Sequence, residues 1–199
     1  MSRPSLEFWY EFASPYSYLS ALRIGELADK HGFDIKWKPF LLGAIFKSQG
    51  MADTPAKLFP AKGNYMWMDV ARTAKKYGWR FQKPTVFPAF ALQAARIAIL
   101  SEGQEWEKSF CEQVFQAYFE KDLDIGQDNV IQDILTSLGL DAQDVWQQAN
   151  SDDNKNKLKA QTQSAIDLGL FGAPTFMVGE EMFWGDDRLE QAIEYLLGQ

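Results

Sequence analysis

Strand-like patterns in this 199-residue chain gather near its two ends, and this distribution constrains the fold more than any other feature. Residues 5–12 predict a strand, residues 15–31 an amphipathic helix and residues 33–38 a second strand, and the next strand-like run begins only at Thr175. A strand, a helix and a strand in this order predict a parallel βαβ unit.

The middle of the chain has loop or helical character instead. Residues 41–60, with their glycines, prolines and small residues, predict a loop. The helices predicted after it cover residues 62–77, 87–101, 105–120, 129–138, 142–149 and 153–168. The chain then returns to strands: residues 175–178 and 181–184 flank Gly179-Glu180 as a hairpin, and a capping pattern at Asp187 opens a closing helix.

Strands from both chain ends, separated by a helical block, indicate an α/β protein in which a large all-helical domain is inserted into a thioredoxin-like domain. The predicted order of elements is βαβ…αββα. We expect residues 1–42 and 170–199 to form the discontinuous thioredoxin-like domain, and residues 43–169 the inserted helical domain.

The chain contains one cysteine and one histidine, which excludes several kinds of site. No internal disulfide, CxxC redox pair or cysteine-based zinc cluster can form, and we expect no metal site. A single histidine also argues against a serine–histidine catalytic pair. His31 followed by Gly32 is typical of a helix C-terminus, and Cys111 beside Phe110 is expected to be buried core.

The net charge of −7 is unevenly distributed. Residues 54–96 contain eight basic side chains and one acid, so this stretch carries +7 and the remainder −14. The stretch is either a solvated helix face or a positive field that attracts a small anion. The acidic remainder argues against a nucleic-acid partner. We find neither a signal-peptide pattern nor an apolar run long enough for a membrane span, and expect a cytoplasmic protein without a membrane partner.

Three short motifs allow both a structural and a functional interpretation. Ser14-Pro15 suits a helix start, and the serine hydroxyl beside unpaired backbone N–H groups also suits an anion such as a thiolate. Ala173-Pro174 is either a loop before a strand or a cis-proline turn. Asp187 either caps the last helix or, together with helix N–H groups, binds a ligand that carries an ammonium and a carboxylate.

The order and spacing of these motifs resemble a known family. Residues 12–19 (FASPYSYL) resemble the opening motif of 2-hydroxychromene-2-carboxylate isomerases and kappa-class glutathione transferases, which belong to the DsbA-like thioredoxin folds. Residues 172–176 (GAPTF) and 183–189 (FWGDDRL) resemble their closing motifs, and residues 60–66 (PAKGNYM) resemble an intermediate one. The resemblance extends over essentially the whole chain.

The resemblance implies roles toward glutathione for individual residues. Ser14 matches the catalytic serine that hydrogen-bonds the glutathione sulfur. The other matching positions are Ala173 for the backbone of the cysteinyl unit, Pro174 for the cis-proline, Asp186 and Asp187 for the γ-glutamyl end, and Lys62 near the glycine end. Residues 50–54 depart from the pattern, because they lack the asparagine that relatives often place near the ligand.

Residues 14–17 (SPYS) stand where a DsbA-type oxidoreductase carries its CxxC pair, with a serine at both cysteine positions. The sulfur for thiol chemistry must therefore come from outside the protein, and the resemblance implies that glutathione supplies it, with Ser14 and the helix N-terminus stabilising its thiolate. The aromatic side chains that we assign to a substrate ring pocket, with core packing as the alternative, are Tyr16, Tyr65, Trp67 and Phe87.

The resemblance implies a glutathione-dependent isomerase of the 2-hydroxychromene-2-carboxylate type. The thiolate would add to an unsaturated carbon of an aromatic conjugated pyruvate, and bond rotation and elimination would follow. Two alternatives stay open: a kappa-class transferase or peroxidase that consumes glutathione, and a non-catalytic DsbA-like binding module. A homodimer, a small aromatic carboxylate as substrate and a place in aromatic catabolism are expected from the family alone.

Overall fold

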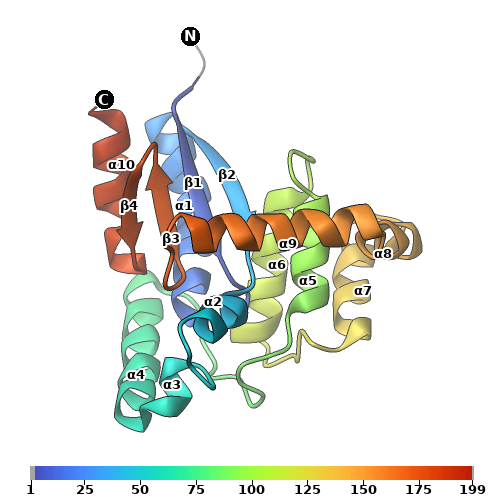
Figure 1. The fold of residues 1–199 in the computed structure, drawn as a ribbon, viewed down its shortest axis with the longest axis horizontal. Coiled ribbons are helices and arrows are strands. Elements are labelled where there is room, and N and C mark those ends of the chain that lie inside the picture. Colours follow the sequence, from blue (N-terminus) through green and yellow to red (C-terminus); the bar gives the residue numbers. More distant parts are fainter. Residues whose placement is uncertain (1–2, 199) are drawn as a thin grey trace.

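The computed structural model describes residues 3–198 and contains a mixed four-stranded sheet in the order β2-β1-β3-β4 (Figure 1). Strand β1 (Ser5–Tyr10) pairs in parallel with β2 (Asp34–Pro39) and antiparallel with β3 (Thr175–Val178), which forms a hairpin with β4 (Glu181–Trp184). The α/β class and the strands from both chain ends are thus confirmed. Residues 1, 2 and 199 of the predicted thioredoxin-like domain lie outside the described range.

The two faces of β1 pack against different layers because successive side chains of a strand alternate. Phe8 belongs to the large core and stacks on Phe176 of β3 with ring centroids 5.5 Å apart. Trp9 points to the opposite face, where it joins a smaller cluster with Phe40 and Met177. Helix α9 (Asp152–Asp167) crosses this second face and is visible in front of the sheet in Figure 1.

Helix α1 (Pro15–His31) follows β1 directly and has the predicted ends. Its last turn is closed by Gly32, whose φ of +76° is a left-handed conformation that favours glycine and whose N–H donates to the Ala28 carbonyl. Strand β1 ends at Tyr10, two residues earlier than predicted. The reason is a turn at Glu11, whose carbonyl oxygen accepts a hydrogen bond from the Ser14 N–H at 3.0 Å.

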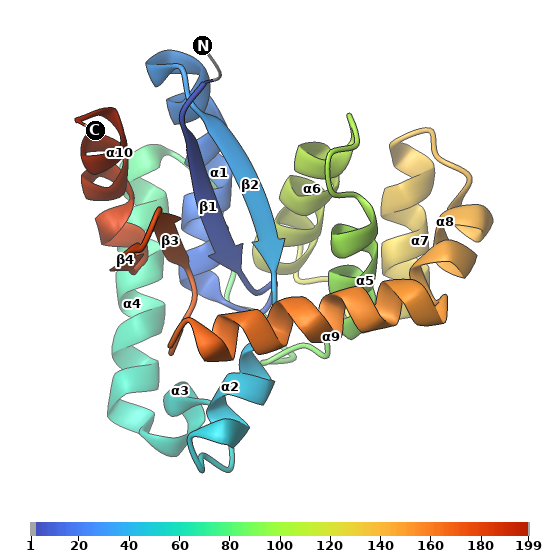
Figure 2. The ribbon, with the colours of Figure 1, turned by 45° about the horizontal axis from the view of Figure 1, so that its top comes forward.

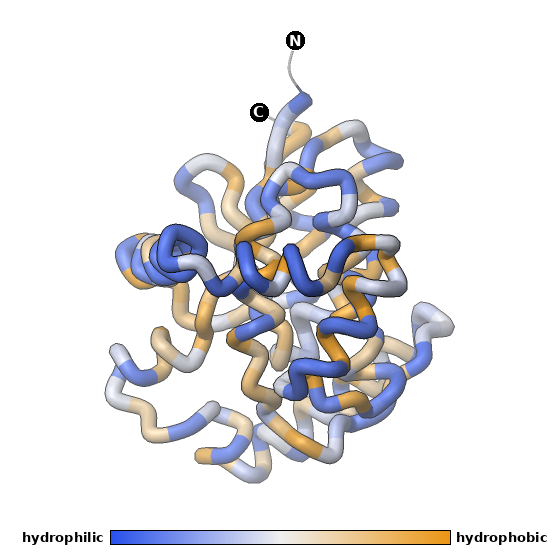
Figure 3. Tube along the Cα trace, turned by 90° about the vertical axis from the view of Figure 1, so that its right-hand side faces the viewer, coloured by the Kyte–Doolittle hydropathy of each residue, from blue (hydrophilic) through white to orange (hydrophobic). Residues whose placement is uncertain are grey.

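In Figure 2 the closing helix lies on the β4 side of the sheet, and the helices of residues 92–149 lie on the β2 side. Hydrophilic and hydrophobic residues alternate along the coiled segments of the trace in Figure 3, as expected for helices with one buried side. The remaining helices are α2 (Leu42–Ser48), α3 (Pro55–Leu58), α4 (Pro60–Tyr77), α5 (Leu92–Leu100), α6 (Glu107–Phe119), α7 (Asp128–Ser137), α8 (Ala142–Ala149) and α10 (Leu189–Leu197).

Three local predictions were wrong. Residues 41–60 contain α2 and α3 rather than only loop, because Ile45 and Phe46 bury their side chains against the protein interior. Helix α5 begins at Leu92 instead of residue 87, and the proline at 88 disfavours a helical conformation of Phe87 before it. Asp187 caps no helix: a short 3-10 turn, Asp186–Arg188, precedes α10.

The division into two domains stays a prediction. Buried side chains from both regions belong to one continuous hydrophobic core, which includes Phe12 after β1, Phe110 of α6 and Leu189 of α10. Cys111 is part of this core, as predicted, and its thiol lies 3.0 Å from the Tyr10 hydroxyl. Across residues 3–198, none of the helices is both long and apolar enough to cross a membrane.

Candidate active site

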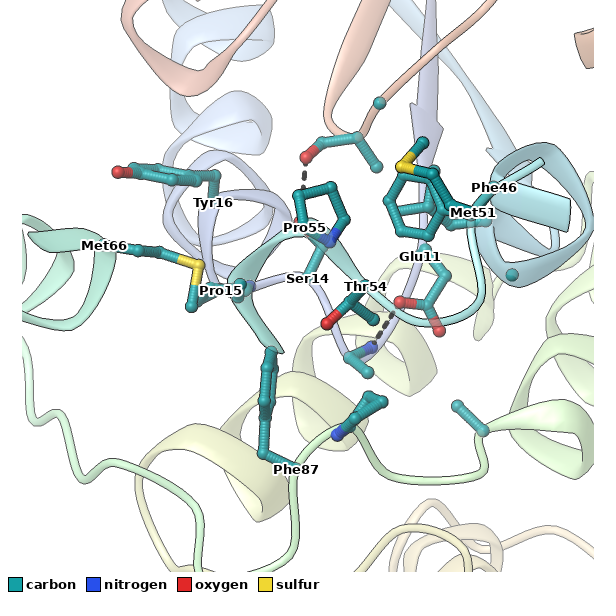
Figure 4. A pocket seen from close by; sticks show the side chains of 18 of the residues that line it. Glu11, Ser14, Pro15, Tyr16, Phe46, Met51, Thr54, Pro55, Met66 and Phe87 are labelled. Carbon is teal, nitrogen blue, oxygen red and sulfur yellow. Dashed lines mark hydrogen bonds between the residues drawn. The ribbon is translucent and has the colours of Figure 1, made fainter. Parts of the chain in front are cut away.

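A cavity of about 1040 Å³ opens where α1 begins. Its walls come from separate parts of the chain: residues 11–16, the α2–α3 segment, the first turns of α4, residues 87–92, residues 171–173 and Trp184. Figure 4 shows several of these side chains around the cavity. The walls are mostly apolar, and Glu11 and Lys62 are the charged side chains among the described residues that line it. An apolar cavity with few polar groups is typical of a small-molecule site.

Ser14 occupies the N-cap position of α1 and lines the cavity. Its Oγ accepts a hydrogen bond from the Ser17 N–H at 3.2 Å and donates one to the Ala173 carbonyl at 2.9 Å. The residue is 7% exposed, and both of these hydrogen-bond partners belong to the protein backbone. The unpaired N–H groups of the first helical turn and the helix dipole make this position favourable for a negative charge.

The Ala173–Pro174 peptide bond is cis, as one of the two sequence interpretations requires. Ala173 lines the cavity beside Ser14, whereas Pro174 is buried and is not among the lining residues. The Pro174 carbonyl accepts a hydrogen bond from the Gly185 N–H at 3.0 Å, which ties this turn to the end of β4. The two chain ends therefore meet at the Ser14–Ala173 contact.

Of the predicted ring-pocket residues, Tyr16, Tyr65 and Phe87 line the cavity, and so does Lys62. The Tyr16 hydroxyl donates to an Asp69 carboxylate oxygen at 3.0 Å, which fixes its ring at the cavity wall. Burial is the first cause that raises the pKa of Tyr16, so its phenol stays protonated. The Lys62 ammonium lies 5.1 Å from the centroid of the exposed Phe59 ring.

Besides Pro174, three predicted site residues lie away from the cavity lining: Trp67, Asp186 and Asp187. Trp67 packs behind the wall, with its ring centroid 4.7 Å from that of Phe87, so the core-packing alternative describes its position. Asp187 is exposed and its carboxylate lies 3.3 Å from the Arg188 guanidinium. Asp186 is buried and already has polar partners within the protein.

The partners of Asp186 are Ser20 and Arg23 of α1. Its Oδ1 accepts from the Ser20 hydroxyl at 2.8 Å and from the Arg23 guanidinium at 3.0 Å. Arg23 also contacts Glu190 of α10. Burial raises the pKa of Asp186, and the Arg23 charge opposes that shift. A side chain engaged in this way is not free to hold the ammonium of a ligand, which leaves Asp187 as the unburied carboxylate of the motif.

Glu11 is a cavity residue that the sequence analysis did not select. Its Oε2 accepts a hydrogen bond from the Ala13 N–H at 2.9 Å, drawn as a dashed line in Figure 4. Burial raises the pKa of Glu11 to about 7, and the Ala13 N–H only partly opposes this. The signal was present in the sequence, because Glu11 is an acid inside the apolar run of residues 8–13.

We expect Glu11 to make stability depend on pH. Its folded-state pKa lies above the ordinary value of 4.5, so its stabilising contribution is complete below pH 4.5 and is lost as the pH rises toward 7. The free energy of unfolding of Glu11→Gln minus that of the wild type should therefore increase over this window, by up to about 1.4 kcal/mol per pH unit. Urea denaturation at half-unit steps of pH measures the difference. A constant difference would contradict the prediction.

The loop that lacks asparagine contributes Thr54 to the cavity. The Thr54 Oγ1 atom is buried and has no hydrogen-bond partner among the described residues. An unpartnered buried hydroxyl costs free energy in the free protein and is typically satisfied by a ligand or water.

The comparisons with known proteins agree with this architecture. A 2-hydroxychromene-2-carboxylate isomerase of Sphingobium xenophagum is 28% identical, over 97% of this chain and 98% of its own length. Glutathione S-transferase kappa 1 of Caenorhabditis elegans is 25% identical, over 97% of this chain and 91% of its own length. A solved structure of 2-hydroxychromene-2-carboxylate isomerase has a TM-score of 0.88 at 25% identity, covering 98% of this chain and 94% of its own. The family model described as "DSBA-like thioredoxin domain" matches residues 5–197, and the chain belongs to that family.

Proposed function

We propose that this protein is a glutathione-dependent isomerase of the 2-hydroxychromene-2-carboxylate type, acting on an aromatic conjugated pyruvate. One observation carries the proposal: the Ser14 hydroxyl stands at a helix N-terminus inside a large apolar cavity, while the chain's own thiol, Cys111, is buried in the core. Burial raises the pKa of Cys111, which keeps it a thiol. Thiol chemistry in the cavity then requires a sulfur from outside.

The residues present fit a bound glutathione. A volume of about 1040 Å³ is at the upper end of the range for small-molecule sites, which leaves space for a tripeptide and an aromatic ring together. The Ala173 backbone would pair with the cysteinyl unit, Lys62 would attract the glycine carboxylate, and exposed Asp187 would attract the γ-glutamyl ammonium. The buried pair with Arg23 supports Asp187 rather than Asp186 for this role.

Bound glutathione would supply the thiolate that adds reversibly to the substrate's conjugated carbon. Ser14 would then turn its hydroxyl from the Ala173 carbonyl to the sulfur and donate a hydrogen bond to it, while the Ser17 N–H continues to donate to Ser14. The first turn of α1 lowers the free energy of negative charge at that point. Tyr65 and Phe87 would hold the substrate ring, and the apolar walls would exclude water.

Isomerase relatives and kappa-class transferase relatives match the chain at similar identity, so a thiol balance separates the two reactions. We expect total free thiol to stay constant, within error, while an arylidene pyruvate is converted between its cis and trans forms. A fall in free thiol that matches substrate consumption would identify a transferase or peroxidase instead. Absence of glutathione binding heat in calorimetry would favour the non-catalytic binding module. The homodimer and the cytoplasmic location expected from the sequence stay predictions.

A further inference from the structure

Glu11 offers the cavity a carboxylate with spare capacity for hydrogen bonds. Oε2 accepts from the Ala13 N–H, whereas no side-chain or backbone donor among residues 3–198 contacts Oε1. The side chain is half-buried and lines the cavity that Ser14 also lines (Figure 4). A carboxylate that the protein satisfies on one oxygen only can exchange a proton with a ligand on the other.

The Thr54 hydroxyl is a second, independent sign of a polar ligand group in this apolar space. Thr54 lines the same cavity, and its Oγ1 is buried and lacks a partner within the described chain. Figure 4 labels Glu11, Ser14 and Thr54 around one cavity. A substrate oxygen bound beside Thr54 would satisfy this hydroxyl, which helps to place that oxygen in the cavity that Glu11 lines.

We propose that Glu11 is the proton-transfer residue of this cavity, moving one proton from the glutathione thiol to the substrate's carbonyl oxygen and back. The inference rests on the proposed function. In the first step, the S–H bond breaks and an O–H bond forms on the Glu11 carboxylate. As the carbonyl oxygen gains negative charge during sulfur addition, the neutral Glu11 carboxyl donates that proton to it. Elimination reverses both transfers, so protons and electrons balance without another reagent.

The surroundings of Glu11 suit proton exchange near neutral pH. Burial raises its pKa to about 7, which is close to the value at which a general acid–base group works best. Tyr118 of α6 is near enough for the Glu11 charge to raise its pKa, and its hydroxyl is engaged with Val86 and Ala89. The titratable groups that other elements bring to the cavity are Tyr16 of α1, and Lys62 and Tyr65 of α4.

The test measures proton release when glutathione binds, independently of turnover. Calorimetry at pH 8 in two buffers of different ionisation enthalpy counts the protons, and absorbance at 240 nm reports the thiolate. For the wild type we expect a thiolate signal with almost no proton release, because ionised Glu11 takes the proton. For Glu11→Gln we expect either release of about one proton per bound glutathione or loss of the thiolate signal. Turnover should fall on the order of 10²-fold, and the acid limb near pH 7 should disappear from its pH profile.

Glu107→Gln is the matched control. Burial also raises the pKa of Glu107 to about 7, but this residue lies at the start of α6 and outside the cavity lining. It should leave proton count, thiolate signal and turnover at wild-type values. A Glu11→Gln protein with the wild-type proton count, thiolate signal and acid limb would overturn the Glu11 assignment while leaving the proposed function intact. If Glu11→Gln does not fold, the number of protons that the wild type releases on binding glutathione tests the assignment instead. Release of a full proton overturns the Glu11 assignment. Absence of glutathione binding overturns the proposed function itself.

Discussion

Replacing Ser14 by alanine is expected to lower kcat on the order of 10³-fold while the free energy of unfolding falls by only about 1–2 kcal/mol. The rate should fall because alanine removes the hydroxyl that, in the proposed reaction, donates a hydrogen bond to the negatively charged sulfur. The stability effect is that of losing the N-cap hydrogen bond from the Ser17 N–H and the hydrogen bond that Ser14 donates to the Ala173 carbonyl. Single-turnover kinetics with saturating glutathione and urea denaturation of the same preparations measure both quantities.

Ser151→Ala is the matched control for this variant. Ser151 caps α9 by accepting a hydrogen bond from the Asn154 N–H at 3.3 Å, so the chemical change and the lost cap are the same. The residue does not line the cavity. We expect a similar loss of stability and an unchanged kcat. Equal kcat values for the two alanine variants would remove Ser14 from the proposed chemistry.

Arg23→Met is expected to destabilise the protein by roughly 3–5 kcal/mol, because it leaves Asp186 buried without its counter-charge. The side chains of both residues are less than a tenth exposed, so water cannot replace the missing guanidinium. Methionine has a similar length and preserves much of the apolar contact of the arginine stem. Urea denaturation at pH 7 measures the loss.

Two further variants show whether the cost arises from the unpaired carboxylate. Adding Asp186→Asn to Arg23→Met removes that charge and should restore part of the stability. Lys155→Met breaks an exposed ion pair with Asp152 and should change stability by less than about 1 kcal/mol. A loss in Arg23→Met no larger than that in Lys155→Met would mean that the buried pair is not a major contributor.

Much of the fold could be predicted because local patterns and final structure agree. The alternation in residues 5–10 and the Ser14-Pro15 and Gly32 signals specify β1 and both ends of α1 with few competing interpretations. A local signal, Gly179-Glu180 between two strand-like runs, likewise predicts the β3–β4 hairpin. In contrast, α2 packs through Ile45 on a buried surface that α9 and β1 supply, and no pattern within residues 41–60 contains that information.

The candidate site was predictable where a short motif determines the backbone, and less so where tertiary contacts decide. Ser14 and Ala173 were found from motifs at the two chain ends, and the structure brings them together. Asp186 and Asp187 are neighbours in sequence, yet only the packing of Arg23 determines which of them is buried. The sequence does not single out Glu11, because the pKa of its carboxyl depends on burial, and burial arises only once the chain has folded around the cavity.

Different segments of the chain form the two sides of the cavity. The Ser14–Ala173 side is built by the sheet and the start of α1, whereas much of the opposite side is built by residues 41–56 and 87–92. Substitutions or insertions in those two segments would reshape this side of the cavity and leave the Ser14–Ala173 wall in place. Under the proposed function, substrate preference would therefore change through these two segments alone, with Ser14 and Ala173 kept in place.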